Sequence, residues 1–334
     1  MYYPSHLPQS RWTRLNNFWS RHTVFDFGDG AGPVSAAQHL NPDKTQGGWV
    51  ASTAKVGQEA FVSQDAVVFQ NAVVADAARV EDKSQVSGKA RMTQQARTRD
   101  RAKVGGCAHM REQALASDDA VMDNYCTVEG ECWLRENVQV KDDAIVGDQC
   151  RIEGDAVVGG QSKVSGRVYL GGHVVVDGES SLEGSLRAFD FVRISGKAQI
   201  KGRTELRQRV QVLDYAEVCD STLVGDVKMA GHSKVIRTDI TMKGAFELGD
   251  HHVITDHTIT PNTTWPQVQK MITKQVPAAV VAPTRGFIPA PVATAPSRLA
   301  GLIPPGLSKH LKVFEDYFKT RLPVGKLPQK LSIR

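Results

Sequence analysis

Three histidines in the central part of the chain have a side chain suited to acid–base chemistry: His109, His173 and His232. Imidazole titrates near neutral pH, so a positioned histidine can accept a proton from a hydroxyl or an amine at working pH. His173 is the favoured catalytic candidate, because Gly171 and Gly172 beside it leave room for a ligand to approach the backbone. The alternative is that these glycines serve only the backbone geometry and that all three histidines are ordinary surface residues.

A second group of residues has the chemistry to bind an anionic polymer, since guanidinium groups neutralise phosphate and stack on bases, as aromatic rings do. These residues recur at steps of 18, or two positions beyond such a step, and they are Arg79, Arg97, Arg99, Trp133, Arg135, Arg151, Tyr169 and Arg187. The alternative is that long side chains only cover the surface of a sheet, with Glu81 and Glu153 as their partners.

The five cysteines do not have a spacing typical of a metal site. Cys126, Cys132 and Cys150 occupy positions that alanine fills elsewhere in the same pattern, so we expect small, buried side chains with inert thiols. A structural metal site would need four ligands at suitable spacing, and no Cys/His cluster supplies them. The sequence therefore predicts no metal site and no required cofactor.

The distribution of charge and apolar residues bears on location and partners. The net charge of +5 comes from residues 254–334, which carry 11 basic and three acidic side chains, whereas the central part is slightly acidic. No apolar run has the length of a membrane span, and the first twenty residues lack the apolar core of a secretory signal. Together with reduced thiols, these features predict a cytoplasmic protein.

Residues 50–253 contain all of these candidates and follow a period of six. From Val50 to Leu248 there are 34 units without an insertion, and every unit except the one at Thr98 begins with an aliphatic residue or Met. The fifth position is mostly small or apolar, and the third is Gly, Asp or Asn in 24 of the 34 units. These three types tolerate the left-handed backbone region best. Each unit therefore predicts a short strand with two inward side chains, followed by a corner.

This pattern resembles the hexapeptide repeat of the left-handed parallel β-helix proteins, many of which are acyltransferases. The Gly47-Gly48-Trp49-Val50 segment is also similar to the start of the repeat in the YdcK-like transferases. The resemblance covers residues 50–253 and implies an all-β fold, a single-stranded left-handed triangular prism of about 11 coils. It further implies acyl transfer from acetyl-CoA or acyl-CoA with a histidine as general base, in a site between the subunits of a trimer.

The segments on either side of the repeat are expected to cap and extend it. Residues 1–49 predict an N-terminal cap, because the open end of a solenoid must be covered. Residues 254–334 predict a Pro-rich basic arm that contains a short amphipathic helix over residues 308–321. This helix either docks on the prism or on another subunit, or binds a membrane surface or an anionic partner.

The flat faces of the prism predict the partners. One outward column is apolar, and we expect it to be buried in a homo-oligomer or against the C-terminal arm. Its apolar members are Val67, Val121, Val157, Val175 and Met229, with Phe69 and Leu213 beside them. The arginine stripe and the basic arm favour an anionic polymer as a further partner.

Two functions stay open at this point. The first is a rigid binding or assembly scaffold without evident catalysis. The second is an acyl-CoA-dependent acyltransferase. The repeat has neither an extruded loop nor the long proline-rich acetyl-CoA signature that several members of the resembled family carry, and these absences favour the scaffold.

Overall fold

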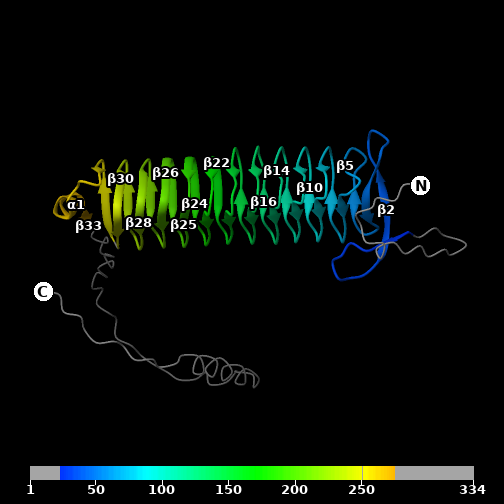
Figure 1. Cartoon of the computed structure of the whole chain (residues 1–334), viewed down its shortest axis with the longest axis horizontal. Coiled ribbons are helices and arrows are strands. Elements are labelled where there is room, and N and C mark those ends of the chain that lie inside the picture. The colour runs from blue at the N-terminus through cyan, green and yellow to red at the C-terminus, as the bar shows by residue number, and fades with distance from the viewer. Residues whose placement is uncertain (1–22, 250, 275–334) are drawn as a thin grey trace, which may run out of the picture. The chain divides into compact units, whose positions relative to one another are not determined.

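The described part of the chain is a parallel β-solenoid in which short strands alternate with sharp corners. The computed structural model describes residues 23–249 and 251–274. Figure 1 shows the coils stacked side by side, from β2 (Val34–Leu40) at the N-terminal end to β30 (Asp239–Leu248) near the other end. The solenoid has about 12 turns, which confirms the predicted all-β parallel architecture.

Most strands are only two residues long, because a corner follows each of them. The short strands are β1 (Val24–Phe25), β4 (Lys55–Val56), β5 (Phe61–Val62), β6 (Val67–Val68), β7 (Val73–Val74), β8 (Arg79–Val80), β9 (Gln85–Val86), β10 (Arg91–Met92), β11 (Arg97–Thr98), β12 (Lys103–Val104), β13 (His109–Met110), β14 (Leu115–Ala116), β15 (Val121–Met122), β16 (Thr127–Val128), β17 (Trp133–Leu134), β18 (Gln139–Val140), β19 (Ile145–Val146), β20 (Arg151–Ile152), β21 (Val157–Val158), β23 (Val175–Val176), β32 (Thr258–Ile259) and β33 (Thr273–Lys274). The longer elements are β3 (Gln46–Ala51), β22 (Lys163–Leu170), β24 (Ser181–Ala188), β25 (Phe191–Ile194), β26 (Gln199–Val212), β27 (Glu217–Cys219), β28 (Thr222–Met229), β29 (Lys234–Ile236), β31 (His252–Thr255) and the helix α1 (Trp265–Met271).

A constant register relates each coil to the next. The same step of 18 holds from Trp49, which lies opposite Val67, to Lys201, which lies opposite Cys219. Backbone N–H groups donate to a carbonyl of the next coil, as from Gly57 to the Val74 oxygen at 2.8 Å. Because the step is constant, residues one coil apart form straight columns on each face.

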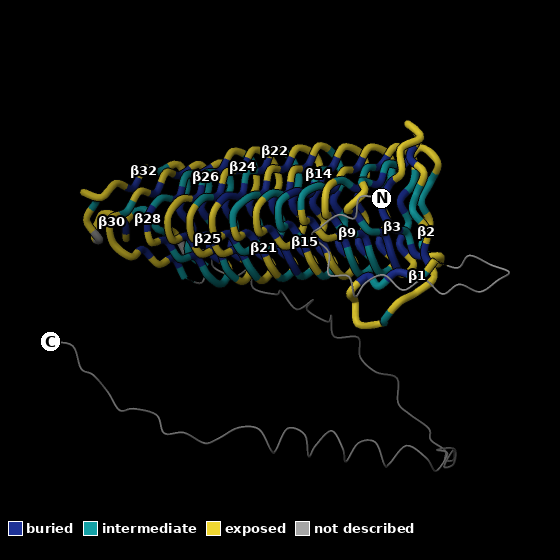
Figure 2. The backbone as a smooth tube through the Cα atoms, turned by 45° about the vertical axis from the view of Figure 1, so that its right-hand side comes forward, coloured by how far each residue is buried: buried dark blue, intermediate teal, exposed yellow. Residues whose placement is uncertain are grey.

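The interior is filled by the first and fifth positions of the units, as predicted. The side chains of Val140, Ile152, Val164 and Val176 are at most 1% exposed, whereas Arg151 points to solvent. Burying an aliphatic side chain of this size stabilises the fold by about 1.5–3 kcal/mol. Figure 2 shows buried and exposed stretches alternating around every coil.

The corners use the left-handed backbone conformation at the third position of the unit. From Gln70 to Asp220 every sixth residue has a positive φ, including many that are not glycine. Where the corner residue is Asp or Gln, its side chain often accepts a hydrogen bond from the corner N–H one coil further on. The Asp148 carboxylate, for example, accepts from the Gly166 N–H at 2.8 Å. These bonds supply a partner for corner N–H groups that would otherwise point away from the ladder.

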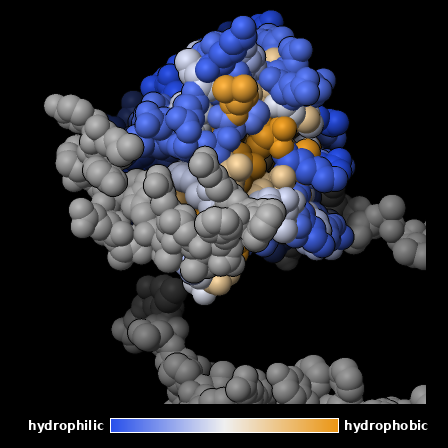
Figure 3. All heavy atoms as spheres, turned by 90° about the vertical axis from the view of Figure 1, so that its right-hand side faces the viewer, coloured by the Kyte–Doolittle hydropathy of each residue, from blue (hydrophilic) through white to orange (hydrophobic). Residues whose placement is uncertain are grey.

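The hairpin of β2 and β3 lies at the N-terminal end of the solenoid, within the segment 1–49 that was predicted as a cap. The buried Asn41 side chain donates to the Val62 carbonyl at 3.1 Å and accepts from the Val62 N–H at 2.9 Å, as a neighbouring strand would. The rings of Phe25 and Trp49 stack at 4.9 Å beside this hairpin. Figure 3 views this end and shows mostly hydrophilic described residues around a smaller hydrophobic cluster.

The period of six does not continue unbroken to Leu248, and this part of the sequence prediction is wrong. The turn after Cys219 is shorter than its predecessors, so Glu205 lies opposite Thr222 where an unchanged step would bring it opposite Leu223. Leu223 and Met229, expected on outer columns, are therefore fully buried. Between Val224 and Asp226 the pairing of β28 with β30 is irregular, because β30 contains extra residues there. These extra residues bring Leu248 back to its inward position, where it lies opposite Met229.

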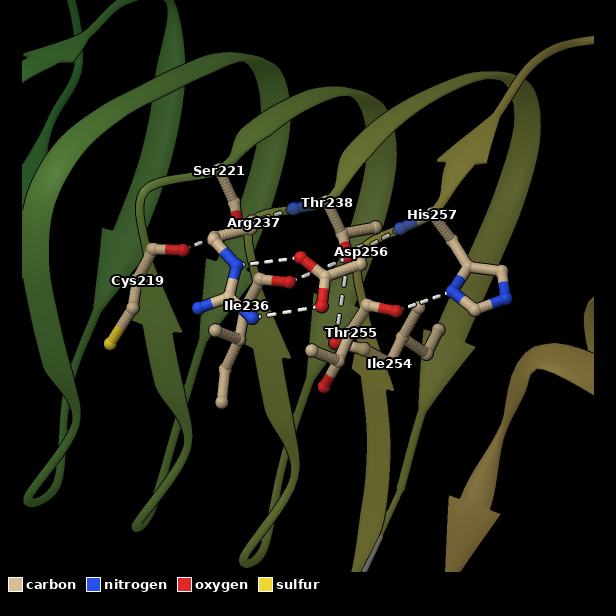
Figure 4. A network of polar contacts seen from close by, with 9 residues as sticks. All are labelled: Cys219, Ser221, Ile236, Arg237, Thr238, Ile254, Thr255, Asp256 and His257. Atoms are coloured by element: carbon tan, nitrogen blue, oxygen red, sulfur yellow. Dashed lines mark hydrogen bonds and ion pairs between the residues drawn. The ribbon is translucent and has the colours of Figure 1, made fainter.

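The shortened turn recurs in the last three coils and places polar side chains inward. The buried Ser221 hydroxyl accepts from the Thr238 N–H at 3.0 Å, and the Thr238 hydroxyl accepts from the His257 N–H at 3.4 Å. On the outside of the same turns, Arg237 forms a two-point ion pair with Asp256, at 2.6 and 2.8 Å. Figure 4 shows this network running across three successive coils.

The repeat also extends beyond the boundary expected at residue 253, since β31 and β32 still pair with the preceding coils. The helix α1 then covers the C-terminal end: Val268 is 1% exposed and packs on the core with Met271 and Ile272. A structured cap therefore occupies residues 265–274, where the sequence predicted an extended arm. The amphipathic helix expected over residues 308–321, and residues 275–307 of the arm, lie outside the described residues, as do residues 1–22.

We predict that alanine is costly at a corner but harmless at a strand end. A Cβ on Gly166, whose φ is 98°, would overlap the Gly184 carbonyl oxygen, whereas a Cβ on Gly147 would meet its nearest atom, Glu129 Cγ, at 3.6 Å. Gly166→Ala should lower the free energy of unfolding by about 1–3 kcal/mol. Gly147→Ala should change it by less than about 0.5 kcal/mol. Denaturant unfolding compares them, and equal effects would contradict the corner geometry.

Candidate functional site

The register places the predicted stripe residues in two adjacent columns on one face. Arg79 lies opposite Arg97, which lies opposite Leu115 and is followed by Trp133. The same column continues through Arg151 and Tyr169 to Arg187. Arg99 and Arg135 lie two positions along, in the neighbouring column, so the structure brings all eight side chains onto one surface.

Two arginines of this stripe form ion pairs within the chain that neutralise their charge. Arg79 forms an ion pair with Glu81 at 2.5 Å and lies over the Phe61 ring at 4.3 Å. Arg151 forms an ion pair with Glu153 at 3.0 Å. These pairs match the alternative interpretation, in which arginine covers the sheet with a carboxylate two positions away.

Glu153 is the most strongly engaged carboxylate of the stripe. Partial burial acts to raise its pKa, but hydrogen bonds from the Tyr169 hydroxyl and from Arg151 outweigh that effect and hold the pKa below its ordinary value. The same hydrogen bond to Glu153 raises the pKa of Tyr169. Tyr169 also packs on Phe189 at 5.1 Å between ring centroids, so this side of the stripe is preorganised.

The other part of the stripe is available to a ligand. Among residues 23–249 and 251–274, Arg97, Arg135 and Arg187 take part in no ion pair. Trp133 lies between them in the stripe and is 44% exposed. Arg99 lies 3.5 Å from the Asp100 carboxylate and is thus partly neutralised.

His173 lies at a corner, where a carboxylate and an aromatic ring flank it. Its Nδ1 is 3.3 Å from the Asp155 carboxylate, and its ring stacks on Phe191 at 5.0 Å. Each of these neighbours lies one coil away from His173, so the step of 18 was the signal that could have found them. A carboxylate at this position orients an imidazole through its Nδ1.

The other two histidines have different surroundings. His109 is exposed on β13, between Arg91 and Thr127 of the adjacent coils. His232 stacks between the rings of Tyr215 and His251, at 4.8 and 5.1 Å. The three predicted histidines therefore lie on separate coils and do not form one site.

The apolar column expected to form an interface differs from the prediction at both ends. Val67 and Phe69 pack against the chain's own Phe25 and Phe27, so the N-terminal segment covers them. Met229 belongs to the interior. Between these ends Val121, Val157 and Val175 stay half-buried on the surface. Val157 lies opposite Val175, Gln139 lies between Val121 and Val157, and the polar residues Lys103 and Arg193 flank the three valines.

The cysteines occupy the interior as predicted. Cys126, Cys132 and Cys150 are at most 1% exposed. Burial raises the pKa of Cys126 to about 12. For Cys150 the pKa is also raised, first by its contact with the Cys132 thiol and then by burial.

The described residues include no group of three His, Cys, Asp or Glu side chains that could hold a metal ion. Within those same residues, no helix is long and apolar enough to cross a membrane.

In comparisons with known proteins, no family model matches the chain and no curated protein matches it.

We predict that the interior thiols are unreactive in the native protein. At pH 8, iodoacetamide should leave Cys126, Cys132 and Cys150 unmodified, because burial keeps the reagent away from all three thiols and the raised pKa of Cys126 and Cys150 leaves these two with almost no thiolate. Cys107 and Cys219, which are partly exposed, should be modified first. Mass spectrometry before and after unfolding measures this order, and native labelling of Cys126 at the rate of Cys107 would contradict the assigned interior.

Proposed function

We propose that the protein is a rigid binding scaffold of the hexapeptide-repeat type, whose stripe binds an extended anionic polymer. The observation that supports this most is the column register, which holds the exposed Trp133 on one face with Arg97, Arg135 and Arg187, three arginines that form no ion pair within the described residues. Adjacent coils are about 4.8 Å apart. A polymer lying along the solenoid axis would therefore meet a charge or a ring every one to three coils.

The proposed binding is weak, salt-sensitive and tolerant of sequence. Three unpaired arginines neutralise about three phosphates of a single strand, which corresponds to a slope near −2 for log affinity against log salt. The side chains that contact bases or sugar rings, Trp133 and Tyr169, stack without reading hydrogen-bond patterns. The basic residues of the C-terminal arm add to the attraction through their charge alone.

We also propose that copies of the chain assemble through the apolar column that contains Val121, Val157 and Val175. This column is on a different face from the stripe, so assembly leaves the stripe accessible. The resemblance to hexapeptide-repeat proteins favours a trimer.

The stripe predicts a specific response to mutation. In full-length protein, Arg97→Gln combined with Arg135→Gln should weaken binding to a single-stranded oligonucleotide by roughly tenfold at low salt. Arg91→Gln combined with Arg209→Gln is the matched control, since these exposed arginines also lack ion pairs among the described residues and lie off both the stripe and the apolar column. Fluorescence anisotropy over a salt titration measures both. An equal loss in the two double variants would show that general charge, and not the stripe, carries the binding.

A second candidate function is acyl transfer, which the pairing of His173 with Asp155 favours. An imidazole held by a carboxylate is the arrangement that a general base for a hydroxyl or amine acceptor requires. Acetyl-CoA or another acyl-CoA would then be a substrate, and the site would lie at a junction between subunits.

If this second function is correct, acetyl-CoA should raise the melting temperature in a saturable way, because it binds the native state. His173→Ala should abolish acyl transfer, and Asp155→Asn should lower it strongly. His109→Ala, on a flat face, should keep the parent's rate. Retention of full activity in His173→Ala, or the absence of any acetyl-CoA-dependent shift, would exclude catalysis at this corner.

A further inference from the structure

We propose that the step in register after Cys219 creates a binding site for a phosphate monoester, at the edge of the stripe. The site is a groove of about 470 Å³ lined by Ser185, Arg187, Arg203, Thr204, Glu205, Asp220 and Thr222. Its ligand is a compact dianion and not a polymer. The groove and the stripe have only Arg187 in common. Binding of a phosphate monoester in the groove can therefore be tested separately from binding of a polymer along the stripe.

The shortened turn opens this groove. One coil earlier, β26 passes through the corner at Gly202 without a break, and Ser185 lies opposite Arg203. In the next coil the corresponding turn is shorter, so Glu205 is paired with Thr222 while Arg203 has no opposite residue. The column that contains Arg203 therefore ends there, and Arg203 lines the groove that follows.

Three arginines surround Ser185, and none of them is neutralised within the described part of the chain. Arg167 lies opposite Ser185 on one side and Arg203 on the other, each about 4.8 Å away at the backbone. Arg187 follows two positions along the same strand, β24. In residues 23–249 and 251–274, these three arginines take part in no ion pair, and all three are exposed.

The two carboxylates that line the groove are already engaged. Glu205 forms an ion pair with Arg207. Asp220 accepts the Arg203 backbone N–H at 2.7 Å. This contact reverses the usual direction, since the carboxylate at a regular corner, such as Asp148, accepts from the following coil. Glu205 is thus neutralised, whereas Asp220 keeps its negative charge, and the guanidinium groups of Arg167, Arg187 and Arg203 outnumber this one carboxylate.

The chemistry of this groove fits a phosphate monoester. A phosphate monoester carries about −1.5 to −2 charges at pH 7 and three strong acceptor oxygens. Guanidinium groups pair with phosphate by two parallel hydrogen bonds. Hydroxyl groups of Ser185 and Thr222 are placed to donate to a remaining oxygen. A sulfate monoester, with a single charge, would be held less tightly by the same groups.

The test uses the full-length protein with phenyl phosphate as the probe, and isothermal titration calorimetry at constant ionic strength measures binding. The parent should show saturable binding. Arg203→Gln and Arg167→Gln should each weaken it by roughly tenfold, as expected for the loss of one charge-assisted contact. Arg91→Gln, at an exposed arginine in a different column and several coils away, should bind like the parent.

Several outcomes would overturn the proposal. One is the absence of saturable binding by the parent, and another is unchanged affinity in Arg203→Gln when thermal melting shows that the variant is folded. A loss of the same size in Arg91→Gln would mean that diffuse charge holds the probe. Binding of phenyl sulfate as tight as that of phenyl phosphate would overturn the assignment to a dianion. Ser185→Ala provides an independent check, since it should weaken binding without altering the net charge.

Discussion

The structure depends on a backbone conformation that must recur at every sixth residue. For an L-amino acid the left-handed region costs about 1–2 kcal/mol, yet the chain adopts it at each corner from Gln70 to Asp220. Glycine avoids this cost at many corners. Asp and Gln offset it elsewhere by accepting the corner N–H of the next coil, as Asp142 does from Gly160 at 3.2 Å. With the corners fixed, each strand must lie in register with the strand one coil further on, and the columns on the faces follow.

The columns connect the fold with function, because they turn spacing in sequence into spacing on a surface. Arg97 and Trp133 are distant in the chain but only two coils apart on one face. Where the length of a turn changes, the residues that align on the surface change as well. The turn after Cys219 is shortened, the buried residues Ser221 and Thr238 are joined by a hydrogen bond across this turn, and Arg203 is left at the end of its own column.

Much of this architecture could be predicted from the sequence, since the period of six specifies both the interior and the corners. The break after Cys219 was missed for a physical reason: residues at the expected inward positions, such as Val224 and Ile236, are apolar, and so are their buried neighbours Leu223 and Val235. When only hydrophobicity is considered, either of these two sets of residues could be the inward one. The left hand of the coil followed from the family resemblance, and periodicity alone does not specify it.

The candidate site was predictable only in part. Alignment at steps of 18 placed the arginines on one face, but it did not distinguish Arg151, which is paired with Glu153, from Arg97, which forms no ion pair among the described residues. That distinction depends on side-chain conformation. The partners of His173 were implicit in the same step, whereas the groove at Ser185 could not be found without the change in register.

Disulfide cross-linking of engineered cysteine pairs tests the register most directly, because it reports which residues face each other in solution. Strands in adjacent coils bring opposed Cα atoms to about 4.8 Å, within the range that a disulfide spans. The account predicts that Arg187→Cys with Glu205→Cys, and Glu205→Cys with Thr222→Cys, cross-link readily under mild oxidation, whereas Glu205→Cys with Leu223→Cys does not, because Leu223 points inward. Efficient cross-linking of the pair at 205 and 223, with none at 205 and 222, would contradict the change in register and the groove that it creates.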